Sequence, residues 1–183
     1  LDRIGHATDG DFDEVQKLDG EISKATPAQQ AKLNARRADA LEQIIAEMDA
    51  KERGVWVRGF ADTVSAAVQG GAYPDGLARL DAMFEKLNKA DEKELAAYLK
   101  YRQMMAEYGA AVKKASDDQA TADTFAKIQN DWEAKLEEFA TDYPKNADSA
   151  DAMMQLGLSR ELAGQPDKAK QWYGKIVENF LAL

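Results

Sequence analysis

The feature that most constrains the fold is a nearly continuous run of helix-forming residues, interrupted by only a few short breaks. Ala, Glu, Lys, Leu and Gln dominate the segments between the breaks, and these residues favour the α-helix. The 183 residues include only 12 glycines and 4 prolines. Val and Ile are scattered singly, without the alternation that is typical of strands. We therefore predict an all-α protein.

The breaks divide the chain into about eight expected helices, whose apolar residues recur every three or four positions. Thr26 and Pro27 form a helix start, with Thr26 as the N-cap and Pro27 at the first helical position. Asp91 is expected to cap the fifth helix, with Glu94 completing a capping box. Short loops between such helices favour antiparallel hairpins. The expected helices cover about 11–24, 27–49, 51–69, 77–87, 92–114, 125–142, 149–162 and 167–180.

The large apolar residues are expected to form the core. Trp56, Trp132 and Trp172 lie at helical spacing beside other apolar residues, so we interpret them as core residues rather than binding platforms. Trp172 is adjacent to Tyr173 and is expected to be the most exposed of the three. In the third helix, Val55 is expected to point inward together with Trp56.

Composition excludes several classes of function. With no Cys, the chain cannot form a disulfide or perform thiol catalysis, and its single histidine, His6, makes a zinc site improbable. A net charge of −9 and a pI near 4.7 argue against nucleic-acid binding. No apolar run approaches the length of a membrane span, and no signal peptide is recognisable. Because the first residue is Leu1, we interpret the chain as a piece of a longer protein.

No catalytic or metal-binding motif is found. Asp9, Asp11 and Asp13 alternate as in a calcium loop, but the required Gly and Glu positions are occupied by Glu14 and Gly20. Carboxylate pairs such as 117–118, 137–138 and 91–92 are expected to be solvated helix faces. The basic pair 36–37 is expected to lie in water, although it is also suited to binding a carboxylate. We predict a non-enzyme without cofactor or metal.

The last segment of the chain carries the most specific pattern. A Tyr143-Pro144 break precedes two expected helices, the first with Leu156-Gly157 and the second with Ala169 and Tyr173, separated by a turn at Gly164. With these residues, 143–180 resembles a tetratricopeptide repeat (TPR), a pair of antiparallel helices of about 34 residues. The resemblance implies that Gly157, which lacks a Cβ, allows the second helix to approach closely.

The segment also departs from the TPR pattern. Met153 stands where the family often has Trp, Arg160 stands where it has Tyr, and no closing Pro follows Phe180. A second break, Tyr73-Pro74, lies 70 residues before Tyr143-Pro144, close to twice the repeat period of about 34. The resemblance thus implies stacked hairpins in a TPR-like right-handed solenoid that is degenerate in its N-terminal half. We expect an N-terminal hairpin region at 1–70 and TPR-like hairpins at 71–183, or one continuous domain 1–183.

The chain as a whole also resembles the helical region that precedes a thioredoxin-like (redoxin) domain in bacterial envelope proteins. The similarity rests on the sequences ATPAQQAKLNARRADALEQI and SAAVQGGAYPDGLARLDAMFEKL and on the repeat segment. It implies an accessory, non-catalytic module whose parent protein carries the thiol–disulfide chemistry in a separate domain. It also implies a location in the bacterial envelope or periplasm, or export, the alternative being a soluble cytoplasmic protein.

The expected functional feature is a surface rather than an active site. In TPR proteins the first helix of each hairpin lines the concave face. In the last repeat this face would include Asp151, Met154, Leu158 and Glu161, a mixture of apolar and acidic groups suited to an extended peptide of basic character. The expected partner is therefore a protein, a peptide or an adjoining domain, and not a nucleic acid or a membrane.

Two alternatives remain open at this point. One is a helical bundle that binds a small apolar ligand, which a pocket lined by Met104, Met105 or Met153 would favour. The other is a free-standing envelope adaptor. Neighbouring helix residues point about 100° apart, so only one residue of Met104-Met105 and one of Met153-Met154 is expected in the core.

Overall fold

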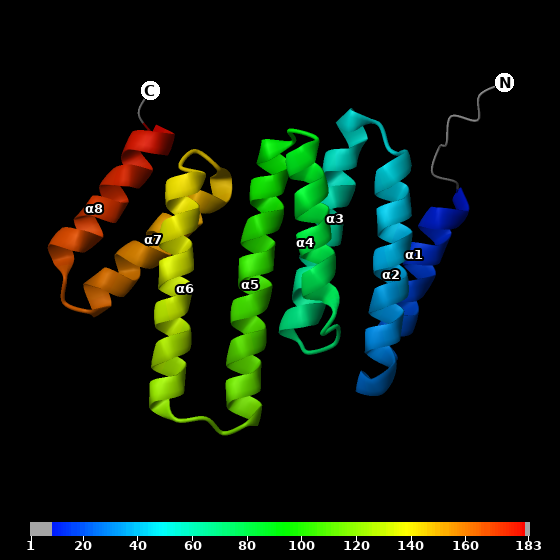
Figure 1. The fold of residues 1–183 in the computed structure, drawn as a ribbon, viewed down its shortest axis with the longest axis horizontal. Coiled ribbons are helices and arrows are strands. Elements are labelled where there is room, and N and C mark those ends of the chain that lie inside the picture. Colours follow the sequence, from blue (N-terminus) through cyan, green and yellow to red (C-terminus); the bar gives the residue numbers. More distant parts are fainter. Residues whose placement is uncertain (1–8, 182–183) are drawn as a thin grey trace. The chain divides into compact units, whose positions relative to one another are not determined.

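The computed structural model describes residues 9–181, and over this range the protein is helical with no strand (Figure 1). The all-α prediction is confirmed. The expected limits agree with the observed helices to within a few residues, except that α8 ends earlier and its last turn is a π-helix, η1 (Val177–Leu181). The α-helices are α1 (Asp9–Ile22), α2 (Pro27–Glu47), α3 (Ala50–Gln69), α4 (Gly76–Lys89), α5 (Lys93–Asp117), α6 (Ala122–Asp142), α7 (Ala147–Leu162) and α8 (Pro166–Ile176).

The helices form two compact units, Leu1–Lys114 and Ala115–Leu183. In the first unit α1 packs on α2, α2 on α3 and α3 on α4, and in the second α6 packs on α7 and α7 on α8. We had expected a boundary between residues 70 and 71. The division falls later because α4 and α5 share one hydrophobic core with α2 and α3.

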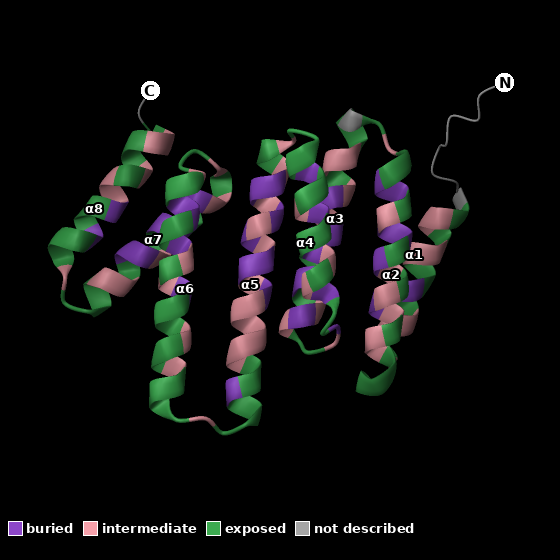
Figure 2. Cartoon of the chain, in the orientation of Figure 1, coloured by how far each residue is buried: buried purple, intermediate pink, exposed green. Residues whose placement is uncertain are grey.

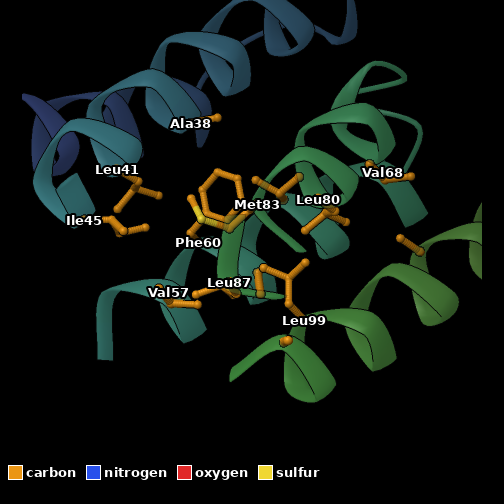
Figure 3. Close-up of a cluster of buried hydrophobic side chains, with 14 of the residues drawn as sticks. Ala38, Leu41, Ile45, Val57, Phe60, Val68, Leu80, Met83, Leu87 and Leu99 are labelled. Carbon is orange, nitrogen blue, oxygen red and sulfur yellow. The ribbon is translucent and has the colours of Figure 1, made fainter. Parts of the chain in front are cut away.

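The core of the first unit is built from four helices. Figure 3 shows side chains of α2, α3, α4 and α5 gathered around Phe60, which is fully buried. Each of the eight helices carries at least one buried residue (Figure 2). The fully buried members contributed by α3, α4 and α5 are Val57, Phe60, Ala61, Leu80, Ala96, Leu99 and Ala106.

The inward face of α3 differs from the expected one. Val55 is 73% exposed, whereas Val57 is fully buried and Trp56 lies half-buried against Phe12, with ring centroids 5.1 Å apart. Because the three residues 55–57 are all apolar, the sequence allows two different rotations of α3 about its axis, one with Val55 facing the core and one with Val57 facing it. Val57 continues the stripe of Phe60, Val64 and Val68, and Val55 faces away from it.

Charged side chains join the helices along the edge of this core. Arg79 of α4 pairs with Asp39 at 2.6 Å and with Glu42 at 3.0 Å, both on α2. Between α3 and α5, Asp62 accepts hydrogen bonds from Tyr98 (2.6 Å) and Arg102 (2.7 Å). Lys86 of α4 lies 3.9 Å from Glu42 as well, so the three cations and three carboxylates of this group balance in charge and tie the helices together.

Four helices end in the same hydrogen-bonded motif, in which one residue adopts a left-handed conformation. After α4, for example, the N–H of Asp91 donates to Asn88 and that of Glu92 donates to Leu87, with Asp91 at φ 57°. This is a Schellman C-cap. Its left-handed residue is Gly71 after α3, Asp91 after α4, Gln119 after α5 and Gly164 after α7.

This arrangement corrects the expected role of Asp91. The residue terminates α4 instead of capping α5, which begins at Lys93. Glu94 forms an ion pair with Arg58 at 3.1 Å instead of completing a capping box. The other expected start is confirmed: Pro27 opens α2, and the backbone N–H of Thr26 donates to the side chain of Gln29 at 3.0 Å.

Candidate functional site

The candidate site is helix α7, and its start is fixed by the Tyr143-Pro144 break. Asn146 caps the helix by accepting a hydrogen bond from the N–H of Asp148 at 3.0 Å. The hydroxyl of Ser149, fully buried, donates to the carbonyl of Tyr143 at 2.6 Å. These two bonds set the rotation of α7 about its axis, and therefore decide which residues face the core.

One face of α7 packs closely against α8. An alanine Cβ at position 157 would lie 2.2 Å from Cε1 of Tyr173, far inside normal contact distance. The close approach expected at Gly157 is therefore present. The same face buries Ala152, Met153 and Leu156.

The opposite face of α7 is exposed and carries all four predicted partner-binding residues. Asp151 and Glu161 are exposed, Met154 is 44% exposed and Leu158 is 49% exposed. Their spacing of three or four residues places them in one stripe along the helix. We call this stripe, together with Leu162, the α7 face.

Leu162 is the member that the sequence analysis missed. It is 91% exposed and follows Leu158 by four residues, as Leu158 follows Met154. We had treated it only as the last residue of the helix. The available signal was the constant separation of four positions between successive apolar residues, Met154, Leu158 and Leu162.

Hydrogen bonds hold the acidic groups of the α7 face, one within α7 and one from α8. Gln155 donates to Asp151 at 2.8 Å and accepts from the indole N–H of Trp132 at 3.2 Å. Burial raises the pKa of the Tyr173 hydroxyl above its usual value, and the hydrogen bond to Glu161 raises it further. Both carboxylates are thus oriented by partners inside the second unit.

The nearby cation of α7 is paired inside the unit. Arg160, which stands where TPR proteins have Tyr, bonds Glu133 of α6 at 3.2 Å, and Ser159 donates to the same carboxylate. Glu133 is largely buried, with a side chain only 13% exposed. The positive charge is therefore used between α6 and α7, and the α7 face remains acidic and apolar.

The other sequence candidates do not form open sites. Trp132 is 6% exposed, and Trp172, which we had expected to be the most exposed tryptophan, is 8% exposed. The ammonium of Lys175 covers the ring of Trp172 at 4.0 Å, which the sequence alone gave no reason to expect. Trp56 is the least buried of the three, in contact with Phe12.

The methionine pairs divide as predicted. Met104 and Met153 are buried, Met105 is half-buried, and Met154 belongs to the exposed α7 face. Two clefts of the first unit, one between α2, α3, α4 and α5 and the other in the α1–α2 hairpin, are lined by none of Met104, Met105 and Met153. The small-ligand alternative therefore gains no support from these clefts.

The arginine pair is engaged rather than solvated. Arg36 pairs with Glu14 at 2.5 Å, and Arg37 pairs with Asp19 at 2.7 Å, so both arginines of α2 reach back to α1. The carboxylate pair at 137–138 lies on the exposed surface of α6, as expected. The other two pairs were wrongly placed: Asp118 lies in the turn after α5, and Asp91 and Glu92 lie between α4 and α5, where Glu92 pairs with Arg53 at 2.8 Å. The side chain of Asp9 and the single histidine, His6, lie outside the described side chains.

Neither a metal site nor a membrane-spanning helix is found among the described residues. Over 9–181, no group of His, Cys, Asp and Glu is arranged to hold a metal ion. None of the helices in that range combines the length and the apolar character needed to cross a bilayer.

Comparison with protein-family models, with curated proteins and with solved structures finds no match. The class of the protein therefore rests on its own structure, an all-α chain of successively packed helices. Its function has to be argued from its surfaces.

Proposed function

We propose that this chain is a non-catalytic helical-repeat module that binds a protein or peptide partner along the α7 face. The observation that carries the proposal is the exposure of three apolar residues, Met154, Leu158 and Leu162, in a single row on a helix whose other side is packed. Scattered single exposed apolar residues are common on proteins, but a contiguous row marks an interaction surface.

The chemistry of the α7 face defines the partner. An apolar row flanked by Asp151 and Glu161 suits a segment that alternates apolar and basic side chains. The apolar contacts provide affinity by burying surface, while the two carboxylates select for Lys or Arg and accelerate association. Because both carboxylates are oriented by Gln155 and Tyr173, little side-chain entropy is lost on binding.

The wider context rests on the two family resemblances. The packing of α6 on α7 and of α7 on α8, and the close approach at Gly157, are in keeping with a TPR-like repeat. A redoxin-like parent and a location in the bacterial envelope follow from the second resemblance. In that context the partner is an adjoining redox domain or its client. The absence of Cys assigns any thiol chemistry to that other domain.

The α7 face is tested by titrating the protein with a fluorescent peptide of alternating Leu and Lys and following anisotropy. We expect Leu158→Ser to weaken binding about tenfold or more, because it removes the centre of the apolar row. Val55→Ser is the control, since Val55 is an exposed apolar residue of α3 that does not belong to the α7 face. It should leave the affinity unchanged.

A charge-reversal series tests the acidic groups separately. Glu161→Lys should weaken binding, whereas Tyr173→Phe, which removes the hydrogen bond to Glu161 but keeps its charge, should have a much smaller effect. Unchanged binding by both Leu158→Ser and Glu161→Lys would refute the assignment of the α7 face. Nuclear magnetic resonance shifts of the bound protein should be largest for residues of α7.

The parent protein is tested by reading the complete coding sequence. A Cys-x-x-Cys in a βαβ context after residue 183, with a signal peptide before residue 1, would support the accessory module of an exported thiol–disulfide protein. A stop codon shortly after residue 183 would remove that context. The α7 face would then belong to a free-standing adaptor.

A further inference from the structure

The hairpin of α1 and α2 contains a groove of about 630 Å³ whose charge is opposite to that of the protein. Three basic side chains, Lys24, Lys32 and Arg36, and one acidic side chain, Glu21, line it, which gives a net charge of +2. The whole chain carries −9. The remaining lining is uncharged: Ala25, Ala28, Gln29 and Leu33.

Among the residues that the structure describes, two of the three cations have no ion-pair partner. Arg36 is paired with Glu14 at 2.5 Å and lies 4.0 Å from Glu21, and Lys17 bridges the same two carboxylates at 3.9 and 4.0 Å. These four groups neutralise one another. In contrast, no carboxylate among residues 9–181 lies within ion-pair distance of Lys24 or Lys32, and both lysines are exposed.

The groove is held by an ordered turn rather than by a loose loop. The hydroxyl of Ser23 donates to the carbonyl of Gly20 at 2.9 Å, and the N–H of Ala25 donates to the carbonyl of Ile22 at 3.2 Å. Thr26 then caps α2 with the help of Gln29. Lys24 therefore extends from this ordered turn, and Lys32 extends from the second turn of α2.

We propose that this groove binds an extended acidic segment of a partner protein. The two lysines contact its carboxylates, and Ala28 and Leu33 pack against the aliphatic parts of the chain. A membrane surface fits less well, because a flat bilayer does not enter a concave groove. This binding is independent of the α7 face, whose partner is basic.

The test uses a fluorescent oligoglutamate peptide and follows anisotropy with the full chain. We expect Lys24→Glu/Lys32→Glu to weaken binding about tenfold or more, since two attractive ion pairs become repulsive. The control variant is Lys168→Glu/Lys170→Glu, which makes the same charge change at two exposed lysines of α8. The control should bind within about twofold of the unmodified protein, because these two lysines do not line the groove.

A neutral variant, Lys24→Gln/Lys32→Gln, separates charge from folding. It should keep the helical content of the unmodified protein and show an intermediate loss of affinity. Equal weakening by the groove variant and the α8 control would overturn the proposal, because only net charge would then matter. So would the absence of measurable oligoglutamate binding. Binding of phosphatidylserine vesicles that requires Lys24 and Lys32, without oligoglutamate binding, would assign the groove to a membrane and also overturn it.

Discussion

The contact between Gly157 and Tyr173 provides the sharpest test of the packing of α7 on α8. A Cβ at position 157 would lie 2.2 Å from Cε1 of the ring and 2.8 Å from Cδ1 and Cζ. Carbon atoms in contact are normally about 3.5–4.0 Å apart, so the Tyr173 ring has to move by more than about 1 Å. Gly157→Ala is therefore expected to disturb the interface instead of filling a gap.

Two opposing effects determine the magnitude. Overpacking a close contact costs about 1–3 kcal/mol. Replacing a helical glycine by alanine favours folding by about 0.8–1 kcal/mol. We expect Gly157→Ala to lower the free energy of unfolding by about 1 kcal/mol. The ring is half-buried and can turn partly outward, so the cost is taken as about 2 kcal/mol, the middle of the range, instead of its upper end.

Gly174 offers a matched control within the same pair of helices. It lies in α8 next to Tyr173, and a Cβ at this position would meet nothing within 4 Å. Gly174→Ala gains the helical preference of alanine without a clash, so it should raise the free energy of unfolding by about 0.5–1 kcal/mol. The two substitutions are chemically identical and are expected to act in opposite directions.

Urea denaturation followed by circular dichroism measures both effects, and a double-mutant cycle isolates the contact. In Gly157→Ala/Tyr173→Ala the ring is absent, so the alanine at position 157 should become neutral or stabilising. Stabilisation by Gly157→Ala alone, equal to that by Gly174→Ala, would show that α8 does not approach α7 at this glycine. The reasoning about the interface would then be wrong.

Three further predictions concern helix ends, burial and pH. Gln119→Gly should raise the free energy of unfolding by about 0.5–1 kcal/mol in urea denaturation, because glycine adopts the left-handed conformation (φ 51°) without steric cost. Trp132→Phe should lower it by about 1–2 kcal/mol in the same assay, since it deletes the bond to Gln155 within a buried site. Burial raises the pKa of Tyr73 above 10.0, so the folded protein should keep this proton longer than the unfolded chain does. Stability should therefore hold below pH 10 and fall as the pH rises above it, and Tyr73→Phe should reduce that fall in alkaline denaturation series.

Much of the helical architecture was predictable because the relevant signals are local. The starting proline at Pro27 and the terminal glycines Gly71 and Gly164 act through backbone conformation, which the neighbouring sequence determines. The prediction that Asp91 caps the start of α5 was wrong because its signal is also local and is ambiguous. Aspartate is favoured at helix starts and also tolerates the left-handed conformation, so the residue type fits both ends of the turn between α4 and α5.

Most of the remaining differences depend on contacts between helices that are distant in sequence. In α3 the spacing itself favours Val57, which precedes Phe60 by three residues, over Val55, which precedes it by five, and Val57 is the one that joins the core with α2 and α4. The boundary between the two units depends on α4 and α5 joining the core around Phe60. The burial of Trp172 depends on its place in the second unit, including the cover provided by Lys175.

The α7 face was predictable in part for a related reason. Once Leu156 is assigned to the buried side, the residues two positions away from it, Met154 and Leu158, must point to the opposite side of the helix. Asp151 precedes Met154 by three residues and therefore lies on the same face as Met154. The bond from Tyr173 to Glu161 was not predictable in this way. It requires the second helix to be at its observed separation, which the close approach at Gly157 permits.

The two proposed surfaces are opposite in charge, and this allows each to serve as the control for the other. A Leu–Lys peptide should respond to Leu158→Ser and be indifferent to Lys24→Glu/Lys32→Glu, whereas oligoglutamate should show the reverse pattern. Non-specific electrostatic attraction between peptide and protein cannot make the two peptides depend on different substitutions in this way. A protein of charge −9 would attract every basic peptide and repel every acidic one, whichever helix was altered. Only discrete sites, one acidic and apolar on α7 and one basic between α1 and α2, make the two peptides depend on different residues.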